Sequence, residues 1–467
     1  MKFYFFNLFL FGFALLTSAQ ALQSSAVFNI KNYGARGDGK TINTQAINNT
    51  IEVCAQTGGG TVVVPAGIYV TGTIKIKSHI TLLLEKGAEI KGVADLNQYD
   101  YYWPPYEMSN NDSAYRVSWN RALILGVGVT DVAITGDGII NGNHVFDPQG
   151  EEGMRGPHAI FFAESRNLSF NGITVNNASN YAFWAYNIEN VVYSHLTINQ
   201  GWDGIDIRGG KHIIIRNCSF FTGDDAIAGG LWEDVVITDC YINSSCNGIR
   251  LIRPAVELTV SHCTFSGPGR YPHRTTKEKQ RTNMLSAILL QPGGWSKAPG
   301  IVDKVHIHDI YINNVNNPIM IVLNEGNSAG KILVERMKAV QVNAYAASVE
   351  SWKGGMFDEV TFRDISIEYV GNPNASSLDA SLGQPEHDAR NLPCWGWFVR
   401  NVHTITFENI DIYYTETDSR PAFYFGNVET VRFNEVNYPE KENLRTVVFK
   451  NSGRWFVGGQ EVATNRK

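Results

Sequence analysis

The chain has 467 residues, and its apolar and charged fractions, 43% and 18%, are those of a globular protein. This length fits one large domain or two ordinary ones, and 44 glycines with 20 tyrosines favour a turn-rich β protein. The formal net charge of −6 argues against a nucleic acid as partner, because phosphate binding requires a basic surface.

The first 21 residues have the features of a secretory signal peptide. Lys2 precedes an apolar run over residues 3–16, and Ala19-Gln20-Ala21 fits a cleavage site with small residues. The run is short for a transmembrane helix and no second apolar span follows, so a retained anchor is the less favoured alternative. We expect a signal peptide over residues 1–21, a secreted (extracellular or periplasmic) protein without a membrane span, and one domain over residues 22–467.

Residues 28–92 predict the capped start of an elongated β fold. A helix is expected from about residue 43 to residue 54, where apolar residues recur at helical spacing. Strands follow, with a turn at Pro65-Ala66-Gly67. A helix in this position would cover the open end of a solenoid, whose exposed strand edge otherwise invites aggregation.

Three segments interrupt the regular pattern further along. Residues 97–119 are rich in tyrosine, tryptophan and proline. Aromatic faces stack on sugar rings, so this loop could border a ligand groove, although packing against the core accounts for the same residues. The other two excursions are residues 267–284, which are basic, and residues 371–391. No linker separates domains.

A short phrase recurs along most of the chain. It consists of an alternating β-branched run, a polar pair and a second alternating run, which predict two strands meeting at a corner. The copies begin at Leu168, Val191, Ile213, Val235, Leu258, Val305, Val360 and Ile405. A period in the low twenties with β units indicates a solenoid, and alternation with period 2 excludes helical repeats. We therefore predict an all-β fold, a single-stranded right-handed parallel β-helix.

Six cysteines remain outside the signal peptide: Cys54, Cys218, Cys240, Cys246, Cys263 and Cys394. An exported protein could pair them, but they form no dense framework, and no cysteine or histidine cluster has zinc-site spacing. Cys218, Cys240 and Cys263 occupy the same place in successive copies, 22 and 23 residues apart. We expect an inward ladder of buried thiols there, in preference to disulfides.

Three aspartates lie among glycines in "GWDGIDI", residues 201–207, and "TGDDAIAGG", residues 222–230. Asp203 and Asp224 are 21 residues apart, about one coil, so both carboxylates are expected on one face. Asp225 would point the other way on a flat strand, so the pair must lie at an irregular corner, which Gly223 permits. Clustered carboxylates suit acid–base chemistry because one pKa is pushed upward. An ordinary turn is the alternative.

These segments resemble those of one enzyme family. The opening, with "GGGTVVVPAGIY" and "HITLLLEKGAEIKG", is similar to that of polygalacturonase-like glycosidases, glycoside hydrolase family 28, and "ITGDGIINGN" to the family's next segment. "WDGIDI" resembles its Asn-Thr-Asp-Gly motif and "GDDAIA" its Asp-Asp motif. The resemblance covers residues 28–294. Other pectin-active β-helices share the opening, so the aspartate motifs are the part specific for hydrolysis.

The resemblance implies a pectin-lyase-like β-helix that hydrolyses pectic polysaccharides with inversion, in a cleft along the solenoid. By matching motif positions, Asp224 would be the general acid, and Asp203 and Asp225 would position and deprotonate the water. An inverting pair needs about 6.5–9.5 Å between carboxyl groups. No metal or organic cofactor is implied. The expected partner is a polysaccharide, and a monomer is expected.

Two further family motifs are missing. Asn247 stands where the histidine of Gly-His-Gly is expected, and residues 283–294 lack the cations of Arg-Ile-Lys. In polygalacturonases those cations grip the substrate carboxylate, so plain polygalacturonic acid is less favoured as substrate. Rhamnogalacturonan-acting relatives also lack the histidine. Trp202 stands beside the first aspartate and could narrow a subsite or stack in it.

Other side chains could replace the missing ones. Arg250 and Arg253 can each bind a carboxylate in a bidentate fork, with a surface salt bridge as the alternative. His273 and Arg274, in the basic excursion, are further candidates. His158 could line the upstream end of the groove, although a lone histidine is more often structural.

We therefore predict a secreted glycoside hydrolase that cleaves an O-glycosidic bond of a pectic or related acidic polysaccharide. A polysaccharide lyase or epimerase on the same scaffold is the first alternative, typically with an arginine or lysine base and often calcium. A non-catalytic polysaccharide-binding β-helix is the second, because the histidine and the motif cations are absent.

Overall fold

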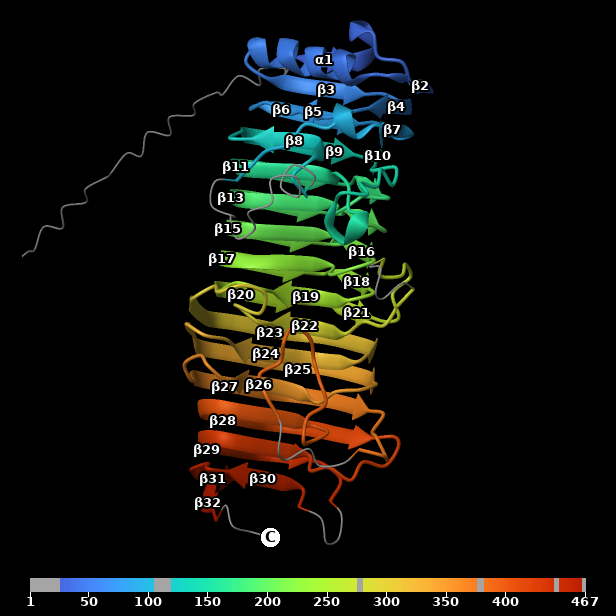
Figure 1. Ribbon diagram of the computed structural model, residues 1–467. Coiled ribbons are helices and arrows are strands. Elements are labelled where there is room, and N and C mark those ends of the chain that lie inside the picture. Colours follow the sequence, from blue (N-terminus) through green and yellow to red (C-terminus); the bar gives the residue numbers. More distant parts are fainter. Residues whose placement is uncertain (1–25, 105–118, 275–279, 376–381, 441–444, 464–467) are drawn as a thin grey trace, which may run out of the picture.

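The structure is a computed structural model and describes residues 26–104, 119–274, 280–375, 382–440 and 445–463. The chain winds as a stack of coils from α1 (Thr44–Gln56) at one end to the last strands at the other (Figure 1). Each strand pairs in parallel with the equivalent strand of the next coil, and an antiparallel strand follows at the C-terminal end. The predicted parallel β-helix is confirmed.

The strands form three parallel ladders that run along the solenoid. The first ladder carries the aspartates and contains β5 (Ile74–Lys75), β8 (Ala122–Val127), β11 (His158–Asn171), β13 (Phe183–Ser194), β15 (Ile205–Arg216), β17 (Ile227–Thr238), β19 (Asn247–Leu251), β22 (Ser286–Leu290), β24 (Asn317–Leu323), β26 (Ala347–Ser351), β28 (Trp397–Tyr414), β29 (Phe423–Asn437) and β30 (Val447–Lys450).

The long strands of the first ladder turn a corner and continue into the second. The second ladder adds β1 (Val27–Asn29), β3 (Gly60–Val64), β6 (Ile80–Leu84), β9 (Thr130–Gly136), β20 (Ala255–Ser261), β23 (Gly300–Val315), β25 (Asn327–Val342), β27 (Phe357–Tyr369) and β31 (Arg454–Val457), followed by the antiparallel β32 (Gln460–Val462). The third ladder contains β2 (Asp38–Ile42), β4 (Gly67–Thr71), β7 (Ala88–Gly92), β10 (Ile139–Asn141), β12 (Thr174–Asn176), β14 (Thr197–Asn199), β16 (Ser219–Thr222), β18 (Tyr241–Ser244) and β21 (Thr264–Ser266), and joins β23.

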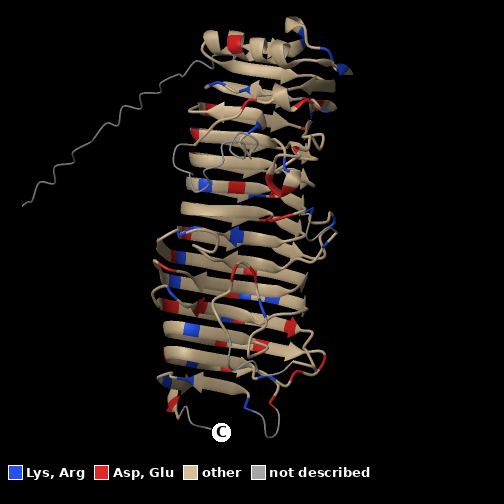
Figure 2. Ribbon diagram, viewed as in Figure 1, with Lys and Arg blue, Asp and Glu red and all other residues tan. Residues whose placement is uncertain are grey.

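Inward side chains of successive coils stack on one another and form the core. In the first ladder Ile205, Ile227 and Ile249 are register partners and are fully buried. Burying one such side chain stabilises the fold by roughly 1.5–3 kcal/mol. Outward positions alternate with these and carry most of the charges, and Figure 2 shows both signs interspersed along the strands. The alternation therefore fixes which side chains face a ligand.

The polar pair of the repeated phrase explains the corner between the second and third ladders. Asn217, Asp239 and His262 precede the three stacked cysteines and have positive φ angles of 54°, 54° and 51°. Asparagine and aspartate are enriched among the non-glycine residues that adopt this left-handed conformation. From β23 onward the phrase lies within one continuous strand, and Asp309, with φ 55°, makes the same bend there.

The N-terminal cap is confirmed. Helix α1 packs against β1, β3, β5 and β6 with Ile47, Ile51 and Cys54 buried beneath it. The described residues also contain three short 3-10 helices, η1 (Ile30–Tyr33), η2 (Leu96–Gln98) and η3 (Glu151–Gly153). The expected signal peptide lies outside the described residues, as do parts of the three expected excursions, residues 105–118, 275–279 and 376–381. In the described ranges no helix is long and apolar enough to cross a membrane.

The six cysteines are free and buried, so the preference for thiols over disulfides is confirmed. The backbone N–H groups of Tyr241 and Thr264 donate to the carbonyls of Cys218 and Cys240, which places Cys218, Cys240 and Cys263 on successive coils. The hydrogen bond with the Cys240 thiol and burial raise the pKa of Cys218. For Cys240 the Cys218 thiol acts to lower the pKa, but the Cys263 thiol and burial outweigh it and raise the pKa. Such thiols are poor nucleophiles and serve as small apolar core groups.

We expect Ellman's reagent to titrate six thiols after the protein unfolds in guanidinium chloride without reductant, and almost none before. A reductant should leave the melting temperature unchanged. Titration of only four thiols in the unfolded, unreduced protein would contradict this prediction, because one disulfide removes two thiols.

Candidate active site

The register of three neighbouring coils brings the aspartates together. Because Ile205 pairs with Ile227, residues 22 apart are neighbours. The Gly204 N–H donates to the Asp225 carbonyl at 3.0 Å, and the Asp224 N–H donates to the Trp202 carbonyl at 3.2 Å. Asp203 is therefore stacked on Asp225, and the expectation that it is stacked on Asp224 is wrong by one residue.

The same register produces a row of outward side chains just before the strands of the first ladder. The backbone pairs in this row are hydrogen-bonded from coil to coil. Its members are His158, Tyr181, Asp203, Asp225, Asn247, Ser286 and Asn317. The row runs along the solenoid axis, so polar groups follow one another at the spacing of the coils, about 4.8 Å.

Asp224 and Asp225 lie at the corner between β16 and β17, as expected. The role of Gly223 differs from the expected one. A Cβ there would lie 2.6 Å from the carbonyl oxygen of Gly201 and 3.0 Å from that of Pro272. Glycine is needed because two backbone segments approach it closely, and this approach lets Asp224 turn outward beside Asp225.

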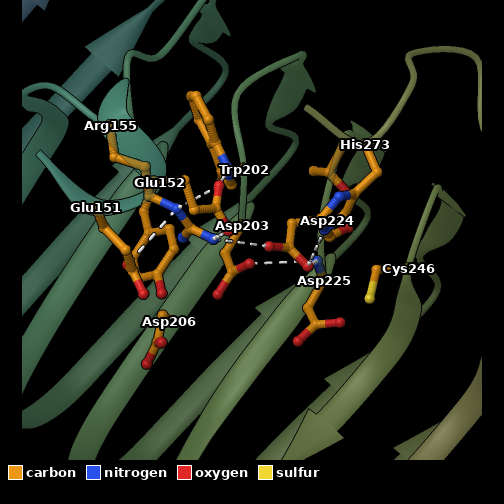
Figure 3. A network of polar contacts seen from close by, with 12 residues as sticks. Glu151, Glu152, Arg155, Trp202, Asp203, Asp206, Asp224, Asp225, Cys246 and His273 are labelled. Atoms are coloured by element: carbon orange, nitrogen blue, oxygen red, sulfur yellow. Dashed lines mark hydrogen bonds and ion pairs between the residues drawn. The ribbon is translucent and has the colours of Figure 1, made fainter. Parts of the chain in front are cut away.

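The three carboxylates form one buried cluster (Figure 3). One oxygen of each lies within 4.8 Å of the others. Asp203, Asp224 and Asp225 are only 4%, 9% and 5% exposed. The Asp225 N–H donates to Oδ1 of Asp203 at 3.2 Å and to Oδ1 of Asp224 at 3.1 Å. Like charges this close in a water-poor site cannot all be ionised without positive neighbours.

Three cationic side chains from three segments meet the cluster. Arg155 Nη2 lies 3.3 Å from Oδ2 of Asp224, and His273 Nε2 lies 3.4 Å from Oδ1 of the same carboxylate. Arg250 Nη1 lies 3.6 Å from Oδ2 of Asp225. His273, predicted as a candidate, thus provides the imidazole that is missing from the expected motif position. Both oxygens of Asp224 are engaged before any substrate is present.

Burial and these charges separate the pKa values of the aspartates. Desolvation, followed by the charges of Asp224 and Asp225, raises the pKa of Asp203 well above its usual value. Burial also acts to raise the pKa of Asp224, but the hydrogen bond and charge of His273 and the charge of Arg155 outweigh it and hold that pKa below its usual range. Desolvation raises the pKa of Asp225. The proton of the cluster is therefore held mainly by Asp203 in the free protein.

Aromatic rings and glutamates hold Arg155 in place on the upstream side. Its guanidinium lies 5.2 Å from the ring centroid of Trp202 and 5.8 Å from those of Trp119 and Tyr181. Glu152 accepts from Arg155 Nη2 at 3.1 Å and from Trp202 Nε1 at 3.0 Å. Glu152 has a left-handed φ of 59°, a conformation that costs on the order of 1 kcal/mol and clusters at functional sites.

On the downstream side an exposed aromatic pair borders the cluster. Trp295 is 59% exposed and stacks on His387, with ring centroids 3.8 Å apart and planes 7° apart. Arg250 lies over the Trp295 ring at 5.1 Å and donates to the His387 carbonyl at 2.8 Å. Asp388 lies 3.6 Å from Arg250. A flat aromatic face beside a cation suits an acidic sugar ring.

Known proteins that act on pectic polysaccharides are similar to this chain in sequence. A family model described as rhamnogalacturonase A/epimerase, pectate lyase-like, matches residues 27–250. An exo-poly-α-D-galacturonosidase of Dickeya chrysanthemi is 27% identical over 44% of this chain, and the chain spans less than half of that relative, 43% of its length. A polygalacturonase of Nicotiana tabacum is 25% identical over 82% of this chain and 95% of its own.

The same fold occurs in a family 28 exopolygalacturonase of Yersinia enterocolitica. The two structures superpose with a TM-score of 0.57 at 15% identity, over 93% of this chain and 78% of the other. The chain is thus similar in sequence to polygalacturonases and shares the fold of a family 28 member. The matched region of the family model includes the three aspartates, Asn247 and Arg250.

Four substrate-binding candidates of this protein lie in different surroundings from those expected. Asn247 is fully buried, and its backbone N–H and Nδ2 both donate to Oδ1 of Asp225, at 3.0 and 2.9 Å. Trp202 is 1% exposed and forms the wall behind Arg155. Arg253 lies past the end of β19, with its backbone against Gly230. Asn247 and Trp202 therefore position charged groups.

His158, the fourth candidate, is a packing residue. It is completely buried among Trp119, Tyr181 and Trp184, with ring centroids 5.2–5.7 Å away. Desolvation lowers its pKa to about 3, so it is neutral at physiological pH. Its Nδ1 accepts from the Tyr181 N–H at 3.3 Å. The structural alternative for this histidine is thus the better description.

Sequence reasoning missed Arg155 and Glu152. Both lie between β10 and β11, where residues 142–157 replace a short corner with an excursion that carries η3. The signal was available, because "EEGMRGP" places two acids three and four residues before an arginine, a spacing that pairs charges on a helical turn. The length of this interruption marks it as a fourth excursion.

The cluster also has the composition of a cation site. The three carboxylates offer oxygen ligands of the kind that calcium and magnesium prefer, and Asp224, Cys246 and His273 form a second group of potential ligands. Arg155 and His273 already compensate Asp224, however, and Arg250 compensates Asp225. Positive charge supplied by side chains favours acid–base chemistry in this cluster.

The raised pKa of Asp203 makes a prediction for stability. The folded state binds the Asp203 proton more tightly than the unfolded state does, so this proton stabilises the fold. The stabilisation is fully present below the unfolded pKa of about 3.9 and is lost as the pH rises through the raised pKa of the folded state. We expect Asp203→Asn to raise the melting temperature at about pH 8, on the order of 1–3 °C, and to have little effect near about pH 4.

The exposed Asp137 provides a control, since Asp137→Asn should not change the melting temperature at either pH. Differential scanning calorimetry across this pH range measures both variants. A lower melting temperature for Asp203→Asn at about pH 8 would mean that the carboxylate at this position stabilises the fold.

Proposed function

We propose that this protein is a secreted glycoside hydrolase that cleaves an acidic pectic polysaccharide by aspartate acid–base chemistry. The observation that carries the proposal is the buried cluster of three carboxylates with Arg155, His273 and Arg250 around it. The names of its relatives supply the reaction class, hydrolysis of polygalacturonate. Secretion follows from the expected signal peptide over residues 1–21, with residues 22–467 as one monomeric domain.

Asp224 donates a proton to the leaving glycosidic oxygen in this proposal, and Asp203 and Asp225 hold the attacking water and accept its proton. In the free protein burial and the neighbouring carboxylates raise the pKa of Asp203, whereas His273 and then Arg155 hold the pKa of Asp224 below its usual range. A uronate carboxylate that pairs with Arg155 removes a positive charge from Asp224. The affinity of Asp224 for the proton then rises, and binding of an acidic substrate prepares the acid for its role.

The substrate enters a site that is walled on two sides. The walls are formed upstream by Arg155 and Trp202 and downstream by Arg250, Trp295 and His387. Every carboxylate of the cluster is less than one-tenth exposed. A chain end fits such a site better than the middle of a polymer, so the proposed action is removal of units from a chain end.

Asp224→Asn should lower kcat by at least about 10³-fold, because it removes the proton donor while keeping the hydrogen-bonding shape. Release of reducing ends from polygalacturonate and rhamnogalacturonan measures the loss, and chromatography sizes the products. Short products from the start of the reaction are expected from a chain-end enzyme. Asp137→Asn, a change of the same kind at an exposed site, should retain full activity.

Products that absorb in the near ultraviolet would instead identify a lyase, because elimination leaves a double bond in the sugar. Full activity of Asp224→Asn would exclude it as the acid.

The resemblance implies inversion, and the anomer released first tests it. The carboxylate oxygens approach within 4.8 Å, whereas about 6.5–9.5 Å separates the carboxyl groups of inverting pairs and about 5–5.5 Å those of retaining pairs. We expect proton NMR during the first minutes to show the anomer opposite to that of the substrate bond. The same anomer in the product would assign one aspartate as a nucleophile.

Arg250→Met should weaken the preference for an acidic substrate. Arg250 lies between Asp225 and the exposed Trp295, so on the downstream side it is placed to meet a sugar carboxylate, as Arg155 is on the upstream side. We expect kcat/KM on polygalacturonate to fall about 10–100-fold, and the fall on the methyl-esterified polymer to be smaller. Lys338→Met, an exposed change on β25, is the control. An equal fall on both polymers would contradict a role in carboxylate recognition.

A further inference from the structure

A second cavity opens on the outer face of the first ladder, near the C-terminal end of the solenoid. Its volume is about 340 Å³, within the range of about 300–1,000 Å³ that is typical of small-molecule sites. It lies over β28, β29 and β30, which form the orange and red end of Figure 1. Several coils separate it from the aspartate cluster, whose members lie just before β15 and β17.

Aromatic rings form one part of the lining. Trp352, Phe398 and Tyr424 all face the cavity. The rings of Phe398 and Tyr424 stack with centroids 5.4 Å apart and planes 24° apart, because their strands are register partners in β28 and β29. Tyr424 and Trp352 remain partly exposed. Such amphipathic rings provide flat apolar surface together with polar tips at the mouth of a cavity.

Two cationic side chains, Arg400 and Lys450, form another part of the cavity lining. Arg400, on β28, places its guanidinium 4.3 Å from the ring centroid of Trp352. Lys450, at the end of β30, also lines the cavity. The Nε of Arg400 is buried and has no hydrogen-bond partner in the described part of the chain. A buried guanidinium N–H without a partner is costly, and an anionic ligand would satisfy it.

The nearest acid in the ladder is already neutralised. Glu350 is the register partner of Arg400. Its two oxygens accept from Arg390 at 2.9 and 2.8 Å, and one of them also accepts from Trp352 Nε1 at 2.6 Å. Glu350 therefore fixes the Trp352 ring and pairs with a different arginine, and the charged residues among the described lining are Arg400 and Lys450, both cationic.

Asparagine side chains fix the rim. Asn401, Asn427 and Asn451 line the cavity and share left-handed φ angles of 58°, 54° and 53° at equivalent corners. Asn427 Nδ2 donates to Asn401 Oδ1, and Asn401 Nδ2 donates to the Ser351 carbonyl, both at 2.5 Å. The ladder accounts for these asparagines structurally, and it also holds their amides in a preformed arrangement.

We propose that this cavity is a second carbohydrate site, which binds a uronate unit of an acidic polysaccharide without cleaving it. The aromatic rings contact the faces of the sugar, and Arg400 and Lys450 bind its carboxylate. The carboxylate-and-sugar chemistry stands on the cavity itself, and only the choice of a pectic polymer rests on the proposed function. Such a site would hold the polymer while the aspartate cluster works on it, since two linked contacts raise the effective concentration.

Calorimetric titration of the full chain with trigalacturonate tests the proposal. Asp224→Asn serves as background, so that no ligand is consumed. We expect two binding events in Asp224→Asn, and loss or at least about tenfold weakening of one when Lys450→Met or Arg400→Gln is added. Lys450 is exposed at a strand end, so its replacement should not disturb folding. Lys338→Met, added in the same way, should leave both events unchanged.

A neutral galactose trimer should bind this site at least about tenfold more weakly than trigalacturonate. Equal binding of the neutral trimer, or an unchanged titration in both Lys450→Met and Arg400→Gln, would overturn the proposal. On the otherwise unmodified protein, Lys450→Met should leave kcat on trigalacturonate within about twofold and raise KM for the long polymer. The titration requires no turnover, so its result is independent of whether the protein hydrolyses the polymer.

Discussion

The chemistry of this protein depends on the register with which one coil stacks on the next. Ile205, Ile227 and Ile249 pack inward at a spacing of 22 residues, and this fixes Asp203 and Asp225 as outward neighbours. A slip of one residue would exchange the inward and outward sets and bury charge in the core. The core thus determines where the carboxylates lie, and the corner between β16 and β17 adds Asp224 to them.

Three buried carboxylates are tolerable only because basic side chains surround them, two from excursions and one from a coil. Arg155 arrives from the excursion after β10, His273 from the one after β21, and Arg250 from β19 itself. Removing one member of such a set leaves the others uncompensated, so these residues are coupled and their effects will not add. The cost in stability falls on Asp203, whose pKa rises because it is buried and because two carboxylates lie beside it.

The sequence was sufficient to predict the coils of the β-helix, but not which excursions return to the aspartate cluster. Alternation with period 2 and the regular spacing of Cys218, Cys240 and Cys263 predicted the β-helix and its inward thiols, and apolar residues at helical spacing over residues 43–54 predicted the cap. The spacing of 21 residues between Asp203 and Asp224 misled by one residue, because Asp224 lies at a corner and not on a strand. Arg155 was missed for a physical reason: which excursion returns to the site is decided by tertiary packing against Trp202, which no local period encodes.

The departures from the family motifs follow a consistent pattern. Asn247, in place of the motif histidine, holds Asp225 with two hydrogen bonds, and His273 from an excursion takes the position beside Asp224. Cations absent from residues 283–294 are matched by Arg155 and Arg250. Residues on the coils are fixed by register, whereas residues on excursions can be exchanged without disturbing the stack. Arg155 and His273 lie on excursions, so the charges around Asp224 can be exchanged while the carboxylates remain in place on the stack.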